Sequence, residues 1–299
     1  MSRLPIRSFL FIPGDSDKKL AKVDDCGADA VILDLEDAVA PENKTKARDM
    51  VADFLVKRQG ERQPQIWVRV NPLDIGLTEG DLQAVVFAKP DGIIQPKTDR
   101  PGDVGQLSAM LDRLEQLHGL ETGNIAVVPV ATETAIAPFH LGEFAGAGLS
   151  RLAGLTWGAE DLATAIGATT NRDAAGEWLF TFRMVRSLTL LAARAAGVQA
   201  IETLHADFRD EAGLRQSSLA ARAEGFGGRL AIHPAQVPII NACFTPSAAE
   251  VDHAQRVLEA FAANPGAGTV GLDGKMLDIP HRKQAERIMA EARAFGLLD

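Results

Sequence analysis

Eight short apolar runs recur along the chain, and most are followed by a stretch with helical periodicity. Near-continuous apolar strands of this kind are typical of a parallel sheet whose outer side is covered by helices. Eight strand–helix units within about 240 residues match the size of a TIM (β/α)8 barrel. We therefore predict this α/β fold, with strands at residues 8–12, 30–35, 66–70, 91–97, 125–132, 152–158, 198–204 and 228–234.

A doubly wound open sheet is the alternative fold for alternating strands and helices. Such a sheet seldom needs eight regular units, and it usually carries a GxGxxG nucleotide-binding turn after a strand. No predicted strand of this chain is followed by that motif. The barrel is the better prediction.

The segment after the eighth unit is longer than a barrel requires. Thr245 or Ser247 can cap a helix that runs to about Ala262, and a glycine-rich loop over 265–274 precedes a last helix from Pro280 or His281. We predict a barrel domain over residues 1–244. Residues 245–299 are expected to form a helix–loop–helix lid or arm that packs on a neighbouring subunit.

Composition narrows the possible partners. The chain has 299 residues and a formal net charge of −9, which argues against a nucleic-acid partner and requires a local basic pocket for any anionic substrate. Its two cysteines, Cys26 and Cys243, form no disulfide or CxxC pattern, and no stretch approaches the roughly 20 apolar residues of a membrane span. We expect a cytoplasmic protein without a signal peptide or a membrane partner.

Polar residues gather where the predicted strands end. In a TIM barrel the catalytic groups stand at the carboxyl ends of the strands, where the βα loops begin. We therefore take these positions as site candidates: Asp34, Glu36, Asp37, Arg69, Asn71, Lys97, Glu133, Gly158, Glu160, Asp161, Glu202, His205 and His233.

Glu133 and Asp161 follow the neighbouring fifth and sixth strands. Two carboxylates, with no cysteine or HxxxH pattern beside them, suit a hard cation such as Mg²⁺, with Mn²⁺ as a possible substitute. Each acid alone could instead cap or precede the helix that follows it. For the pair on adjacent strands we favour a metal site.

Arg69 lies in an otherwise buried strand and needs an anionic partner. That partner is either a substrate carboxylate or one of Asp34, Glu36 and Asp37. Lys97 faces the same choice. We expect Glu36, Asp37 and Lys97 to support the metal site from outside its direct ligands, although Asp37 is equally well explained as a helix N-terminal acid.

Several motifs together resemble the citrate lyase β-subunit-like branch of the HpcH/HpaI aldolase superfamily. They cover nearly the whole chain: FIPGDSDKKLAK, GADAVILDLEDAVAPENKTKAR, WVRVNP, TETA, WGAEDLATAIGA, ADFRD, AIHPAQV and GKMLDIPHRKQAERI. The resemblance implies a Mg²⁺-dependent TIM barrel that acts on CoA thioesters of hydroxy acids, commonly as a trimer or hexamer. The expected function is a carbon–carbon lyase that converts a citryl-, malyl- or citramalyl-CoA-like thioester into an acyl-CoA and a 2-oxo acid.

The same resemblance assigns roles to individual residues. It implies Glu133 and Asp161 as metal ligands, Arg69 as the substrate-carboxylate arginine and Gly158 as a substrate contact. Asp278 in MLDIP matches an aspartate that works in a neighbouring subunit's active site. In the basic first loop the resemblance suggests contacts to the CoA phosphates from Lys18, Lys19 and Lys22.

Two segments depart from the commonest pattern of the family. These are TTNRDAAGEWLF and IETLHADFRD, which we expect to shape the acyl pocket. Other functions therefore stay open: a malyl-CoA thioesterase with malate synthase-like chemistry, a CoA-independent 2-oxo acid aldolase, or a subunit of a citrate lyase complex.

Overall fold

The computed structural model describes residues 5–58, 60 and 63–298. The chain divides into two compact units, one of residues 6–240 and one that contains residues 241–298. Each unit has a hydrophobic core of its own. Among the described helices, none is both long and apolar enough to span a bilayer.

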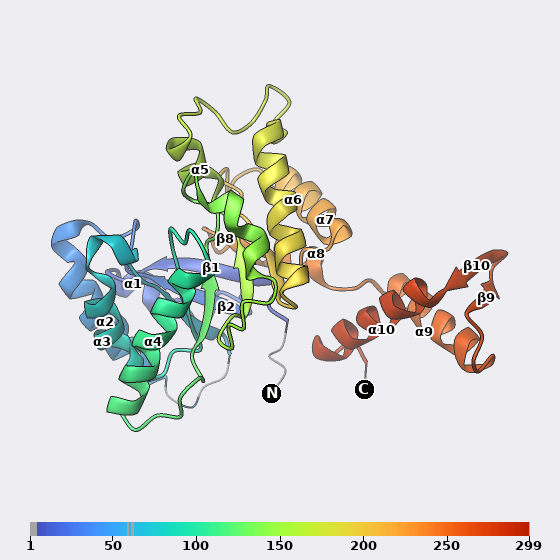
Figure 1. Cartoon of the computed structure of the whole chain (residues 1–299), viewed down its shortest axis with the longest axis horizontal. Helices are drawn as coiled ribbons and strands as arrows, with labels where there is room; N and C mark the ends of the chain where they lie inside the picture. The colour runs from blue at the N-terminus through green and yellow to red at the C-terminus, as the bar shows by residue number, and fades with distance from the viewer. Residues whose placement is uncertain (1–4, 59, 61–62, 299) are drawn as a thin grey trace. The chain divides into compact units, whose positions relative to one another are not determined.

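The larger unit contains eight strands that pair in parallel in the order β5-β4-β3-β2-β1-β8-β7-β6. Figure 1 shows helices around these strands. The arrangement is a nearly closed TIM barrel, which confirms the predicted fold. The strands are β1 (Ser8–Pro13), β2 (Ala30–Asp34), β3 (Gln65–Arg69), β4 (Gly92–Gln95), β5 (Ala126–Pro129), β6 (Gly154–Thr156), β7 (Gln199–Glu202) and β8 (Gly228–Ala231).

Helical segments follow the strands, and several are split or short. After β2, a 3-10 turn precedes the α-helix, and after β5 the helical segment is a 3-10 helix only. The segments are α1 (Asp17–Leu20), η1 (Pro41–Asn43), α2 (Lys44–Lys57), η2 (Leu73–Ile75), α3 (Thr78–Val85), η3 (Val86–Ala88), α4 (Pro101–Leu117), η4 (Ala137–Phe144), α5 (Ala159–Ala165), α6 (Phe180–Ala195), α7 (Glu211–Glu224) and α8 (Gln236–Phe244).

The barrel closes between β5 and β6, the two ends of the strand order. Val127 donates its N–H to the Arg151 carbonyl at 2.7 Å, and Ala153 donates to the Val127 carbonyl at 2.9 Å. Further along, Ala131 donates to the Thr156 carbonyl at 3.0 Å. These bonds bring the carboxyl ends of β5 and β6 together, and the loops that follow them therefore start side by side.

Large side chains fill the barrel interior. Trp67 of β3 is 1% exposed and lies across Gly92 of β4, its partner in the ladder. A Cβ at Gly92 would stand 2.2 Å from the indole ring, so only glycine leaves room for this tryptophan. Isoleucine, valine and alanine side chains from the other strands complete the core: Ile32, Ile94, Ala126, Val128, Val130 and Ile201.

The smaller unit contains two helices and a β-hairpin. Helix α9 (Ala248–Ala262) begins with a capping box in which Ser247 and Glu250 satisfy each other's backbone N–H groups. Strands β9 (Thr269–Leu272) and β10 (Lys275–Asp278) pair antiparallel, and α10 (Ile279–Ala294) follows. Residues 265–274 were expected to be a loop, but Asp273 and Gly274 both have positive φ, as a two-residue hairpin turn requires.

A buried ion pair anchors β6 to the neighbouring helix α4. Arg151, just before β6, is 4% exposed, and Glu115 of α4 is fully buried. Arg151 donates to Glu115 Oε1 and to the Ile125 carbonyl, each at 3.0 Å. Glu115 also accepts the backbone N–H groups of Gly123 at 2.8 Å and Ile125 at 3.2 Å. The pair thus fixes the start of both strands that close the barrel.

Removing the carboxylate of this pair should destabilise the barrel. Glu115→Gln leaves the Arg151 guanidinium buried without its main counter-charge, and we expect the free energy of unfolding to fall by about 3 kcal/mol. Urea denaturation followed by circular dichroism measures the change. Glu121→Gln, at an exposed position next to the same loop, is the control and should change little. A loss for Glu115→Gln no larger than that of the control would contradict this role.

Candidate active site

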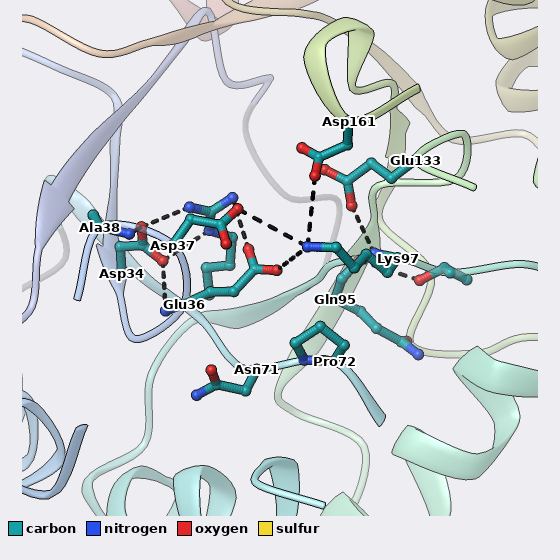
Figure 2. Close-up of polar contacts among 12 residues, drawn as sticks. Asp34, Glu36, Asp37, Ala38, Asn71, Pro72, Gln95, Lys97, Glu133 and Asp161 are labelled. Carbon is teal, nitrogen blue, oxygen red and sulfur yellow. Dashed lines mark hydrogen bonds and ion pairs between the residues drawn. The ribbon is translucent and has the colours of Figure 1, made fainter. Parts of the chain in front are cut away.

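The predicted site residues of the larger unit meet at the carboxyl ends of the strands. Arg69 ends β3, Lys97 follows β4, Glu133 follows β5, and Asp161 lies in the first turn of α5, directly after β6. Figure 2 shows Glu133 and Asp161 both directed toward Lys97, with the acidic residues that follow β2 on its other side. The structure therefore brings these side chains into one cluster.

Arg69 is held by two carboxylates of the chain itself. Its Nε and Nη2 donate to the two oxygens of Asp34 at 2.8 and 2.6 Å, and its Nη1 lies 2.9 Å from Glu36 Oε2. Burial alone would lower the pKa of Arg69, but the bonds to Asp34 and the charge of Glu36 raise it above its ordinary value. A guanidinium has five N–H donors, so these three contacts leave two for another group.

Lys97 joins the two halves of the cluster. Its backbone lies in the left-handed region at φ 46°, which is uncommon for a residue other than glycine. In this conformation the Lys97 N–H donates to Glu133 Oε2 at 2.6 Å. Its ammonium donates to Glu36 Oε1 at 2.8 Å and lies 3.6 Å from Asp161 Oδ1 and 3.9 Å from Asp37 Oδ2. Burial opposes the charge on Lys97, yet these carboxylates raise its pKa.

The two predicted metal ligands differ in their surroundings. Glu133 is 6% exposed, whereas the side chain of Asp161 is 35% exposed. The pKa of Glu133 is raised to about 8, mainly by burial and also by the nearby charges of Asp161 and Glu36. The hydrogen bond from the Lys97 N–H and the charge of Arg69 lower this pKa, but by less. A nearby cation would therefore stabilise the ionised form of Glu133.

Gly158 provides the space for Glu133. A Cβ at this position would stand 2.7 Å from the Glu133 Cγ and 2.8 Å from its Oε1. The Gly158 N–H donates to the Thr132 hydroxyl at 3.0 Å, which ties the residue after β6 to the residue before Glu133. The geometry gives Gly158 a steric role. A contact between Gly158 and substrate stays a prediction.

The alternative explanation of the two acids as helix caps does not describe Glu133. The N-cap residue of the next helix, η4, is Ile136 and not Glu133. The Glu133 carboxylate instead accepts a hydrogen bond from the N–H of Lys97, which lies in another loop. Helix α5 has Gly158 as its N-cap residue, and Asp161 lies in its first turn, where the helix dipole favours a negative charge. Asp161 can thus support the helix and still contribute to the cluster.

The cluster carries an excess of negative charge that suits a divalent cation. Five carboxylates (Asp34, Glu36, Asp37, Glu133 and Asp161) surround two cationic side chains, Arg69 and Lys97. Among the described residues, no group of three or more His, Cys, Asp or Glu side chains is arranged to enclose an ion. The residues present fit an ion such as Mg²⁺, which binds through one or two carboxylates and keeps several waters.

Other predicted residues lie apart from this cluster. Lys18 and Lys19 lie in α1 after β1 and Lys22 follows it, all three exposed at the carboxyl side of the barrel. Asp278 is in the smaller unit, where it caps α10 and contacts His281 Nδ1 at 2.5 Å. His233 stacks on Phe208 with ring centres 4.7 Å apart.

Asp34 is the site residue that the sequence analysis undervalued. It was one of the site candidates and one of three alternative partners for Arg69, and in the structure it is 1% exposed and binds the guanidinium with both oxygens. Its position opposite Arg69 in the β2–β3 register explains this contact. The sequence shows where the two strands end but not which of their residues lie opposite each other. Without this register, the contact between Asp34 and Arg69 could not be predicted.

Comparisons with known proteins show the family of this chain. The family model for HpcH/HpaI aldolase/citrate lyase matches residues 7–234. A (3S)-malyl-CoA thioesterase of Cereibacter sphaeroides is 36% identical, over 98% of this chain and 96% of its own. The citrate lyase subunit beta of Escherichia coli strain K12 is 37% identical, over 97% of this chain and 94% of its own.

A solved structure of a related protein is similar over nearly the whole chain. The protein CitE of Mycobacterium tuberculosis, in complex with magnesium, acetoacetate and coenzyme A, superimposes with a TM-score of 0.78 and 31% identity, over 97% of this chain and 98% of that one. The expected class, a lyase enzyme, is supported by the citrate lyase relative. From the family match and these near-full-length similarities, the chain belongs to the HpcH/HpaI aldolase/citrate lyase family.

Proposed function

We propose that this protein is a Mg²⁺-dependent carbon–carbon lyase that cleaves or forms a 3-hydroxyacyl-CoA thioester. The products of cleavage would be an acyl-CoA and a 2-oxo acid, with a citryl-, malyl- or citramalyl-CoA-like substrate. One observation carries the proposal: Glu133 and Asp161 stand at the closing seam of the barrel, in a cluster with more carboxylates than cationic side chains.

Glu133 and Asp161 are the proposed metal ligands. A bound Mg²⁺, or Mn²⁺ in its place, would supply Lewis-acid polarisation of a substrate carbonyl. The Lys97 N–H orients Glu133 for this role, and the space left by Gly158 accommodates the side chain. Glu36 and Asp37 act on the site through Lys97, which they hold in place.

Arg69 and Asp278 are the proposed catalytic residues of the chain. When the carbon–carbon bond breaks, the hydroxyl group would lose its proton to water and become the carbonyl of the 2-oxo acid, and the electron pair of the broken bond would pass to the acyl-CoA fragment as an enolate. The two N–H groups that Arg69 has beyond its acidic partners would bind a carboxylate or the enolate oxygen. Asp278, from a neighbouring subunit, would supply the proton at the enolate carbon.

The CoA part of the substrate would contact the first βα loop. Lys18, Lys19 and Lys22 are exposed there, and their ammonium groups are suited to phosphate oxygens. They lie after β1, at the same end of the barrel as the carboxylate cluster. Coenzyme A is thus proposed as part of the substrate and not as a separate cofactor.

Hydrolysis of the thioester is the second candidate function. It is favoured by the similarity to a (3S)-malyl-CoA thioesterase over nearly the whole chain. Citryl-, malyl- and citramalyl-CoA should be offered to the purified protein with and without Mg²⁺. An acyl-CoA and a 2-oxo acid as products would establish the lyase, and free CoA with the hydroxy acid would establish the thioesterase.

We also propose that the protein works as a homo-oligomer, a trimer or hexamer. A row of exposed apolar side chains along one face of α6 supports this: Phe180, Met184, Leu188 and Leu191. Their spacing of three or four residues places them on one side of the helix. A cytoplasmic location is a further proposal, which rests on two cysteines that form no disulfide.

Replacing either proposed metal ligand should abolish Mg²⁺-dependent cleavage. We expect Glu133→Gln and Asp161→Asn each to lower kcat/KM about a thousandfold or more, because Lewis-acid stabilisation is worth several kcal/mol. The matched control is Glu160→Gln, next to Asp161 in α5, where the side chain accepts from Asn171 instead. Full activity in either ligand variant, with Mg²⁺ still required, would refute the assignment.

Mg²⁺ binding should depend on pH through Glu133. The metal requires the carboxylate, and the metal-free pKa is about 8, so Mg²⁺ must displace a proton below that pH. We expect the affinity to rise about tenfold per pH unit up to pH 8 and to level off above it. Calorimetry in buffers of different ionisation enthalpy measures both the affinity and the released proton. A flat affinity between pH 6 and 9 would contradict the raised pKa.

A further inference from the structure

A fourteen-residue loop over 166–179 joins α5, the helix that carries Asp161, to α6 (Figure 1). Its two arms are bonded to each other: Leu179 donates its N–H to Asn171, and Asp173 donates to Glu177. The Asn171 amide also donates to Glu160 Oε1 at 2.9 Å, which ties the loop to α5. The loop is therefore ordered, and it is held beside the helix that carries Asp161.

Aromatic contacts connect this loop to the site. Trp178, near the end of the loop, packs edge-to-face on Trp157, with ring centres 5.1 Å apart. Trp157 is fully buried and donates its Nε1–H to Glu202 Oε1 at 2.7 Å. It directly precedes Gly158, the residue that makes room for Glu133. Trp178 thus has a fixed place next to the end of β6.

Arg172 of this loop lies over the ring of Trp178. The centre of its guanidinium is 3.5 Å from the centre of the ring, a cation–π contact. Its Nη1 donates to the Gly176 carbonyl at 2.6 Å. Since a guanidinium has five N–H donors, this single bond leaves four of them for another group.

Arg172 lacks the close carboxylate partner that three other arginines of the barrel have. Arg69 is paired with Asp34, Arg151 with Glu115, and Arg186 with Glu202. Within the described part of the chain, no carboxylate oxygen lies within ion-pair distance of Arg172. Partial burial lowers the pKa of this guanidinium, although the charges of Glu160, Glu177 and Glu202 raise it from beyond ion-pair distance.

We propose that Arg172, held by Trp178, binds an anionic group of the thioester substrate. Its planar N–H fork suits a carboxylate or a phosphate equally, so the group is either a carboxylate of the acyl part or a phosphate of the CoA part. Arg69 is already paired with two carboxylates and has only two N–H groups left, so a substrate with several negative charges needs a further basic contact. Arg172 supplies the basic contact that an anionic substrate needs in a chain with a net charge of −9. This inference rests on the proposed thioester substrate.

Binding measurements on the full chain test the proposal and separate the two sources of the anion. Calorimetry in the presence of Mg²⁺ should compare CoA with oxaloacetate on the wild type, Arg172→Gln and Arg172→Lys. Arg183→Gln, at an exposed position in α6, is the matched control for loss of one positive charge. Near-ultraviolet circular dichroism of the tryptophans reports whether each variant is folded.

We expect Arg172→Gln to weaken one of the two ligands by roughly ten- to one-hundredfold, the range for a hydrogen bond to a charged group. Weaker CoA binding assigns the phosphate, and weaker oxaloacetate binding assigns the carboxylate. Arg172→Lys keeps the charge without the fork and should show a smaller loss, which covers the case in which the glutamine variant does not fold. Mg²⁺ affinity should not change.

Two results would overturn the proposal. If both Arg172 variants bind CoA and oxaloacetate as tightly as Arg183→Gln does, Arg172 does not bind the substrate. If the wild type binds neither ligand, the thioester function itself fails and the role of Arg172 fails with it. The first result leaves the proposed function standing, and the second does not.

Discussion

The hydrogen bonds that close the barrel between β5 and β6 determine where its chemistry can occur. Three backbone bonds join these strands, from Val127 to Ala131 on one side and from Arg151 to Thr156 on the other. They bring together the loops that start with Glu133 and Gly158. The buried Arg151–Glu115 pair fixes the opposite end of the same seam. A strand shift of one residue here would separate Glu133 from the space that Gly158 leaves for it.

Electrostatics then explain why the cluster suits a cation and why an anionic substrate needs basic contacts of its own. Glu133 is buried among other acids, and its raised pKa expresses the cost of its negative charge. Lys97 offsets part of that cost with its backbone N–H and its ammonium. A divalent ion would offset more of it. Arg69 is paired with Asp34 and Glu36, whereas Arg172, in the loop after α5, lies over Trp178 and has no carboxylate oxygen within ion-pair distance in the described chain.

Much of this architecture is predictable from the sequence, and the failures have physical causes. Apolar runs that alternate with helical segments predict the eight strands, and the strand order places Glu133 beside Asp161. The hairpin of β9 and β10 was predicted as a loop because its glycines suggested mobility, although Asp273-Gly274 is a strong turn signal. The left-handed backbone of Lys97 and the stacking of Arg172 on Trp178 depend on contacts between distant segments, which periodicity and motifs do not encode.

The central claim is that Glu133 and Asp161 together bind the metal ion of a lyase site. A crystal structure of the protein soaked in Mn²⁺, with anomalous data, tests it most directly. The account predicts an anomalous peak about 2.1 Å from a carboxylate oxygen of both residues, with water or a 2-oxo acid filling the other positions. A peak that contacts neither residue, or the absence of any peak in crystals at saturating Mn²⁺, would contradict it.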